Sequence, residues 1–111
     1  MFQNALLIVL KFAARLKGLD LSKLFENAAM LSAVAQMVYE KFFKGREIGD
    51  GTLLRDLLRE IWENKEEILE FVLMILRLFG VLADDEIVPT VGIASAEIEA
   101  DFNALCDALS T

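Results

Sequence analysis

Carboxylates are the side chains whose number and spacing in this sequence come closest to a chemical site. Three acidic residues, Asp84, Asp85 and Glu86, are adjacent, and five glutamates lie between residues 60 and 70. Clustered carboxylate oxygens suit hard cations such as calcium. However, residues 84–86 lack the ligand spacing of a calcium-binding loop, and carboxylate metal sites in helical bundles pair Glu-x-x-His motifs. We therefore interpret both clusters as solvated surface and predict no metal site.

The residues needed for the commonest kinds of catalysis are missing. The sequence contains no histidine, which removes the most frequent general base and zinc ligand, and only one cysteine, Cys106. Cys106 lies beside the apolar stripe of a predicted helix, so we interpret it as a small buried hydrophobic residue rather than a reactive thiol. A single cysteine forms no internal disulfide and gives no sign of an oxidising compartment. We predict a cytoplasmic protein that is not an enzyme and has no catalytic residues.

The glycine-rich stretch Gly45–Thr52 could be considered as a phosphate-binding loop. In the G-x-x-x-x-G-K-[ST] pattern, however, Asp50 would occupy the second glycine position and Gly51 the lysine position. The shorter dinucleotide pattern beginning at Gly49 fails as well, because Leu54 stands where its third glycine belongs. We therefore predict no nucleotide site and no cofactor.

The longest helical pattern covers residues 52–80, and we expect the rest of the chain to be organised around it. Apolar residues recur there at steps of three and four, which indicates a single helical face. Thr52 is a suitable N-cap and Gly80 a suitable helix end. Asn64, followed by Glu67, offers an alternative start for a separate helix. Because the apolar stripe stays in phase across Asn64, we favour one continuous or slightly bent helix.

The second half of this stretch is almost entirely apolar. Between Phe71 and Leu82 only Arg77 and Gly80 are not large apolar residues, a pattern typical of a helix surrounded by other helices. This segment and the uncharged first ten residues of the chain are the strongest candidates for apolar surface beyond what one small core can cover.

Three further helices and one extended segment are expected. Gly18 and Gly45 are suitable helix stops, and Val88 before Pro89 is biased toward extended backbone. The predicted helices cover residues 2–17, residues 20 or 22 to about 44, and a last segment that starts at Ser95, with an extended strap at about residues 83–94. These elements describe an all-α fold, a compact bundle of four to five helices in a single domain, residues 1–111.

Two interpretations of the first helix remain open. Its apolar face, which includes Phe2, Leu6 and Val9, either lies in the bundle core or forms an arm that docks on another subunit or on a membrane surface. The longest uncharged run, residues 27–39, is much shorter than the roughly 20 residues needed to span a bilayer. We therefore expect no membrane-spanning helix.

Composition and charge favour a protein partner over nucleic acid. The apolar fraction of 56% is high for a soluble domain, which suggests apolar surface that a partner covers. Residues 1–49 carry seven basic and four acidic groups, residues 50–111 carry four basic and fourteen acidic groups, and the net charge is −7. An acidic chain without a clustered basic face is unsuited to nucleic acid. Its acidic half is expected to face solvent, a basic partner, or the basic half of another copy.

These observations lead to a hypothesis of function. We expect a non-enzymatic assembly or interaction module whose partner is protein and which forms homo-oligomers through apolar helix faces. The alternative is a peripheral membrane-surface protein that uses its first helix. The residues expected to form the interface come from the two most apolar segments: Phe2, Leu6, Val9, Phe71, Met74, Leu78 and Phe79.

Overall fold

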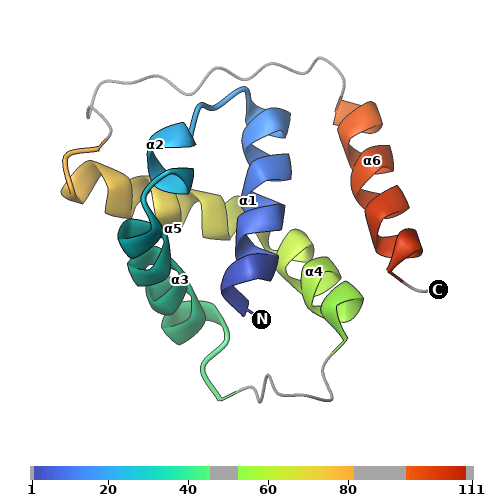
Figure 1. The fold of residues 1–111 in the computed structure, drawn as a ribbon, viewed down its shortest axis with the longest axis horizontal. Helices are drawn as coiled ribbons and strands as arrows, with labels where there is room; N and C mark the ends of the chain where they lie inside the picture. Colours follow the sequence, from blue (N-terminus) through green and yellow to red (C-terminus); the bar gives the residue numbers. More distant parts are fainter. Residues whose placement is uncertain (1, 46–52, 82–94, 110–111) are drawn as a thin grey trace.

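The structure is a computed structural model that describes residues 2–45, 53–81 and 95–109. Within these residues the chain forms six helices and no strand, which confirms the all-α class (Figure 1). The helices are α1 (Phe2–Lys17), α2 (Ser22–Phe25), α3 (Ala28–Phe42), α4 (Leu54–Glu63), α5 (Lys65–Leu78) and α6 (Ser95–Ala108). The predictions for Thr52, for the rest of the glycine-rich stretch after Gly45, for the acidic residues 84–86 and for the extended segment 83–94 lie outside the described residues.

Helix α1, rather than the 52–80 stretch, is the element around which the described chain is organised. It contacts α3, α4, α5 and α6, and among its sixteen residues only Asn4, Lys11 and Arg15 are exposed. The expectation that residues 52–80 hold the central place was therefore wrong. The physical reason is that α1 is apolar on nearly every side, whereas the later stretch keeps a charged face in water. The first helix is part of the core, as one of its two interpretations proposed.

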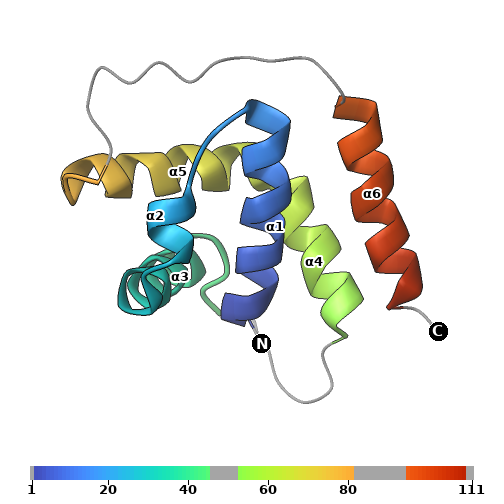
Figure 2. The ribbon, with the colours of Figure 1, turned by 45° about the horizontal axis from the view of Figure 1, so that its top comes forward.

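The 52–80 stretch contains two helices, α4 and α5, which meet at Asn64 and run in clearly different directions (Figures 1 and 2). The Asn64 side chain donates a hydrogen bond to the Glu60 carbonyl oxygen at 2.9 Å, and its backbone N–H reaches the Ile61 carbonyl oxygen at 3.1 Å. Its own carbonyl oxygen accepts from the Ile68 N–H at 3.0 Å and so begins α5. The favoured continuous helix was wrong. The Asn64 side chain supplies a hydrogen-bond donor to a carbonyl oxygen in the last turn of α4, so the helix can end there and the chain can turn.

A second interruption divides the helix predicted from residue 20 or 22 to about residue 44. The short α2 ends first, and Asn27 then begins α3 by accepting a hydrogen bond from the Met30 N–H on its side-chain oxygen at 3.0 Å. Asn27 has the extended backbone of an N-cap residue, with φ −107° and ψ 98°. Ahead of α2, the Asp20 carboxylate accepts from the Ser22 N–H at 3.0 Å. The Ser22 hydroxyl and N–H together hold the pKa of the Asp20 carboxyl below its ordinary value.

Loss of the Asn27 cap should weaken α3. We expect Asn27→Ala to lower the free energy of unfolding by about 1 kcal/mol, because the Met30 N–H loses its partner. Asn27 is exposed, so the substitution removes no core contact. Asn27→Asp, which keeps an acceptor oxygen at the same place, should retain most of the stability. Urea denaturation followed by circular dichroism measures both variants, and equal losses in the two would contradict the capping role.

The helix ends predicted at Gly18 and Gly80 are confirmed, whereas α3 ends at Phe42 and Gly45 lies in the turn that follows. All three glycines take positive φ, at 67°, 92° and 76° respectively, a conformation that costs residues with a side chain roughly 1–2 kcal/mol. After Gly80 the Val81 N–H returns to the Leu76 carbonyl oxygen at 2.9 Å, which closes the last turn of α5.

Aromatic rings from three helices hold α6 against α1 and α4. Phe102 is only 1% exposed; its ring stacks on Trp62 with centroids 4.2 Å apart and meets Phe12 edge-on at 5.5 Å. Cys106, one turn further along α6, is fully buried, which confirms its interpretation as a small core residue. Leu109, by contrast, is exposed, so the buried stripe of α6 ends at Cys106.

Candidate interaction surface

The C-terminal end of α5 carries more exposed large apolar side chains than any other described helix. Leu78 is 76% exposed, and Met74 and the adjoining Phe79 are each 47% exposed. On the opposite side of the same helix, Val72 and Leu76 lie in the core. The prediction that this segment is surrounded by other helices was therefore wrong for its described part. Both ribbon views show why: the end of α5 extends past α2 and α3 (Figures 1 and 2).

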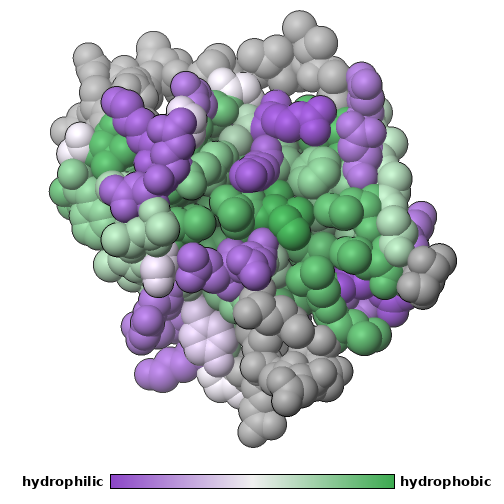
Figure 3. Space-filling view, viewed as in Figure 1, coloured by the Kyte–Doolittle hydropathy of each residue, from purple (hydrophilic) through white to green (hydrophobic). Residues whose placement is uncertain are grey.

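Half-buried Phe71 adjoins Met74 and Leu78 at steps of three and four residues, which makes the three side chains neighbours on the helix surface. We refer to Phe71, Met74, Leu78 and Phe79 as the α5 patch. In the face drawn in Figure 3, apolar residues gather across the middle of the molecule, between groups of hydrophilic residues. Apolar areas therefore reach the surface of this molecule.

An open groove between α3 and α5 borders the α5 patch. It has a volume of about 530 Å³ and is lined by Met37, Glu40, Lys41, Lys44 and Phe71. The Lys41 ammonium nitrogen lies 5.2 Å from the centre of the Phe71 ring, within the range of a cation–π contact. The groove thus combines an aromatic floor with two cationic side chains and one carboxylate.

The seven residues predicted to form an interface separate into two groups. Leu6 and Val9 are buried in the core, and the Phe2 ring is half-buried against Tyr39 and Phe43, with centroids 5.4 and 5.2 Å apart. Leu6 and Val9 therefore belong to the core, whereas Phe2 packs against the fold with part of its side chain still in solvent. The other four are the residues of the α5 patch, and their role in an interface stays a prediction.

Two neighbours of the α5 patch, Met37 and Lys41, were missed. Met37 is 37% exposed beside the groove. The groove joins these residues to Phe71, thirty or more positions later, and no local pattern indicates which sides of two distant helices will meet. The spacing of Met37, Lys41 and Lys44, four and then three residues apart, is the only signal in the sequence that places them on one face.

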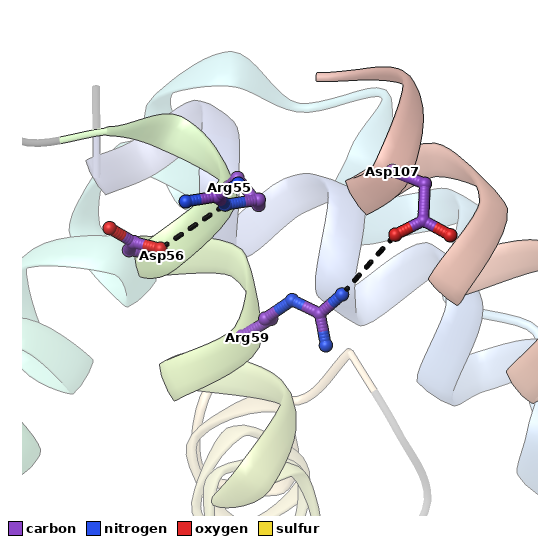
Figure 4. A network of polar contacts seen from close by, with 4 residues as sticks. All are labelled: Arg55, Asp56, Arg59 and Asp107. Atoms are coloured by element: carbon purple, nitrogen blue, oxygen red, sulfur yellow. Dashed lines mark hydrogen bonds and ion pairs between the residues drawn. The ribbon is translucent and has the colours of Figure 1, made fainter. Parts of the chain in front are cut away.

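The described acidic helix α6 lies at the opposite edge of the molecule from the end of α5 (Figures 1 and 2). Two of its carboxylates approach basic residues of the same chain: Asp101 lies 3.7 Å from Arg15, and Asp107 lies 3.6 Å from Arg59. Figure 4 shows the Arg59 side chain of α4 reaching across to Asp107, beside a second ion pair within α4. Exposed pairs of this kind contribute at most about 1 kcal/mol each. Their contribution to the stability of the fold is therefore small.

Metal-ligating and nucleophilic side chains are sparse among the described residues. No three carboxylate or thiol groups among them lie close enough together to hold a metal ion. Burial raises the pKa of the Cys106 thiol, because removal from water disfavours the thiolate. The thiol is therefore protonated and shielded at neutral pH, which makes it a poor nucleophile. Among these same residues, no helix combines the length and apolar content that crossing a membrane requires.

Comparisons of the chain with models of protein families, with curated proteins and with solved structures find no match. The class of protein is therefore defined by the fold alone: a small all-α helical domain. Its two distinctive surfaces are the α5 patch at one edge and the acidic α6 at the other. The functional argument rests on these surfaces.

Proposed function

We propose that this chain is a non-enzymatic interaction module that associates with itself through the α5 patch. The observation that carries the proposal is the exposure of Leu78, Met74 and Phe79 together at the end of one helix. Single exposed apolar residues are ordinary, whereas several that adjoin one another are typical of a surface that a partner covers. The net charge of −7 makes copies of the chain repel one another, which limits association through the rest of the surface.

The proposed contact is small, and this sets its strength. One helix end and its surroundings offer less area than the roughly 800 Å² per partner of a standard interface. We therefore expect a reversible dimer with a Kd of about 10–100 µM. Contact at the end of α5 also leaves α6 in solvent, because α6 lies at the far edge (Figure 2).

Self-association is favoured over membrane-surface binding by the first helix. Membrane binding of that kind needs an apolar helical face that is free to enter the lipid interface. The apolar side chains of α1, including Leu6 and Val9, instead pack against four other helices. Exposing them to lipid would require the core to open.

Substitution of Leu78 tests the proposed function. Leu78→Gln should weaken self-association by at least about tenfold, because burial of a leucine side chain contributes about 1.5–3 kcal/mol. Leu53→Gln is the matched control: Leu53 is 57% exposed but lies at the start of α4, outside the α5 patch. Both changes remove an exposed leucine without altering the net charge. Sedimentation velocity from about 5 to about 500 µM covers the expected Kd.

The expected result is a concentration-dependent dimer for the wild type and for Leu53→Gln, and a monomer over most of the range for Leu78→Gln. Circular dichroism should show the same helical content in all three proteins, since both leucines are exposed. A wild-type protein that stays monomeric throughout, or two variants that weaken association equally, would overturn the proposal.

A further inference from the structure

The exposed side of α5 is complementary to itself, and we propose that two copies of this chain pair through an antiparallel α5–α5 contact whose two-fold axis passes beside Met74. This inference rests on the proposed self-association and assigns its geometry. In such a contact the same surface serves both copies, and residues on the same side of the helix that lie about equally far before and after Met74 meet across the axis.

The apolar residues agree with this register. Phe71, Met74 and Leu78 follow one line along α5, at steps of three and four residues. With the axis beside Met74, the two Met74 side chains meet each other. Each Leu78 then meets the Phe71 ring of the second copy, since the two residues lie four positions after and three positions before Met74. Every exposed apolar side chain on this line gains an apolar neighbour.

The charges agree with the same register. Glu70 and Arg77 flank Met74, four residues before it and three after it, so they are about 10 Å apart along the helix axis and too distant to pair within one chain. Neither makes an ion pair or side-chain hydrogen bond within the described residues, and the buried Nε of Arg77 has no hydrogen-bond partner there. The two-fold axis brings each Glu70 to the Arg77 of the other copy, which forms two symmetrical ion pairs.

The alternative registers bring like charges together. An antiparallel pair centred on Phe71 places the two Glu70 carboxylates within one turn of each other, and a pair centred on Leu78 does the same for the two Arg77 side chains. A parallel pair places both residues beside their own copies. Like charges at such positions oppose association. Of these arrangements, the antiparallel register at Met74 is the one that pairs opposite charges with each other and also pairs apolar side chains with each other.

Disulfide trapping tests the geometry. In the antiparallel pair, Met74→Cys should form an intermolecular disulfide on mild oxidation at least about tenfold faster than Leu78→Cys, because two Leu78 positions are about 12 Å apart along the axis. Disulfides require Cα atoms within about 7 Å of each other. Leu53→Cys measures the rate of random collision, and the native Cys106 is buried and contributes little. Equal trapping of Met74→Cys and Leu78→Cys, or trapping of neither above the Leu53→Cys rate, would overturn the antiparallel pair.

Charge exchange tests the ion pairs independently. Glu70→Lys and Arg77→Glu should each weaken the dimer by about tenfold, and the variant carrying both changes should recover most of the affinity, because the exchanged charges pair again across the axis. A double variant as weak as either single variant would contradict the pairing. A wild-type protein that dimerises without Met74 trapping would remove this geometry and leave the proposed function in place, whereas a monomeric wild type would remove both.

Discussion

Replacing Phe102 with alanine should lower the free energy of unfolding by about 3–5 kcal/mol and release α6 from the rest of the molecule. The Phe102 ring is buried against Trp62 of α4 and Phe12 of α1. Its loss leaves a cavity and also removes a stacking contact that contributes beyond the area buried. The remaining core side chains of α6, Ile98 and Cys106, are too few to hold a short helix that is marginal in isolation.

Two signals already present in the chain report this release. Trp62 is the only tryptophan, so its fluorescence follows the loss of the stacked ring directly. Cys106 is buried and its pKa is raised, so a thiol reagent should modify it slowly in the wild type and much faster in Phe102→Ala. Leu109→Ala, at an exposed position just after α6, should change the free energy of unfolding by no more than about 0.5 kcal/mol. An unchanged stability together with a protected thiol in Phe102→Ala would show that α6 is held by other contacts.

Leu6→Ala should lower the free energy of unfolding by about 2–5 kcal/mol, measured by urea denaturation of the monomer. Leu6 is completely buried in α1, the helix that contacts four of the others. Neighbours on several sides restrict how far the structure can relax into the space left by the side chain, which places the cost toward the upper part of that range.

Leu78→Ala is the matched control, because it removes the same atoms from an exposed leucine. We expect it to change the free energy of unfolding by less than about 0.5 kcal/mol and to weaken self-association. Leu6→Ala should act on stability and leave the association of the folded fraction unchanged. A Leu6→Ala protein of normal stability but weakened association would mean that α1 serves as a docking arm.

The signals that predicted the fold correctly are local ones. Gly18 and Gly80 end helices because their backbone conformation disfavours other residues, whatever lies around them. Asn27 and Asn64 also act locally, but an asparagine can equally lie on a helix surface, cap the next helix or end the previous one. Which role it takes depends on where the two flanking helices find apolar partners, and the spacing of residues does not contain that information.

Only part of the candidate interaction surface could be predicted from the sequence, and the reason is related. Periodicity identified an apolar face that includes Leu6 and Val9 in one helix, and the almost uniformly apolar segment 71–82 drew attention to Phe71 and Met74 in another. Nothing in the sequence distinguishes which of the two is covered. In the structure the first is covered by four helices, whereas the end of α5 extends beyond its neighbours and leaves Met74 exposed.

By itself, the sequence determined that the chain is helical, that helices end at Gly18 and Gly80, and that the 111 residues contain no histidine and no pair of cysteines for an internal disulfide. Only the tertiary structure decided that α1 occupies the centre, that α6 is held by the Phe102 ring, and that Leu78 remains in water. Hydrophobicity belongs to each residue and can be read along the chain, but burial depends on which distant segments reach that residue.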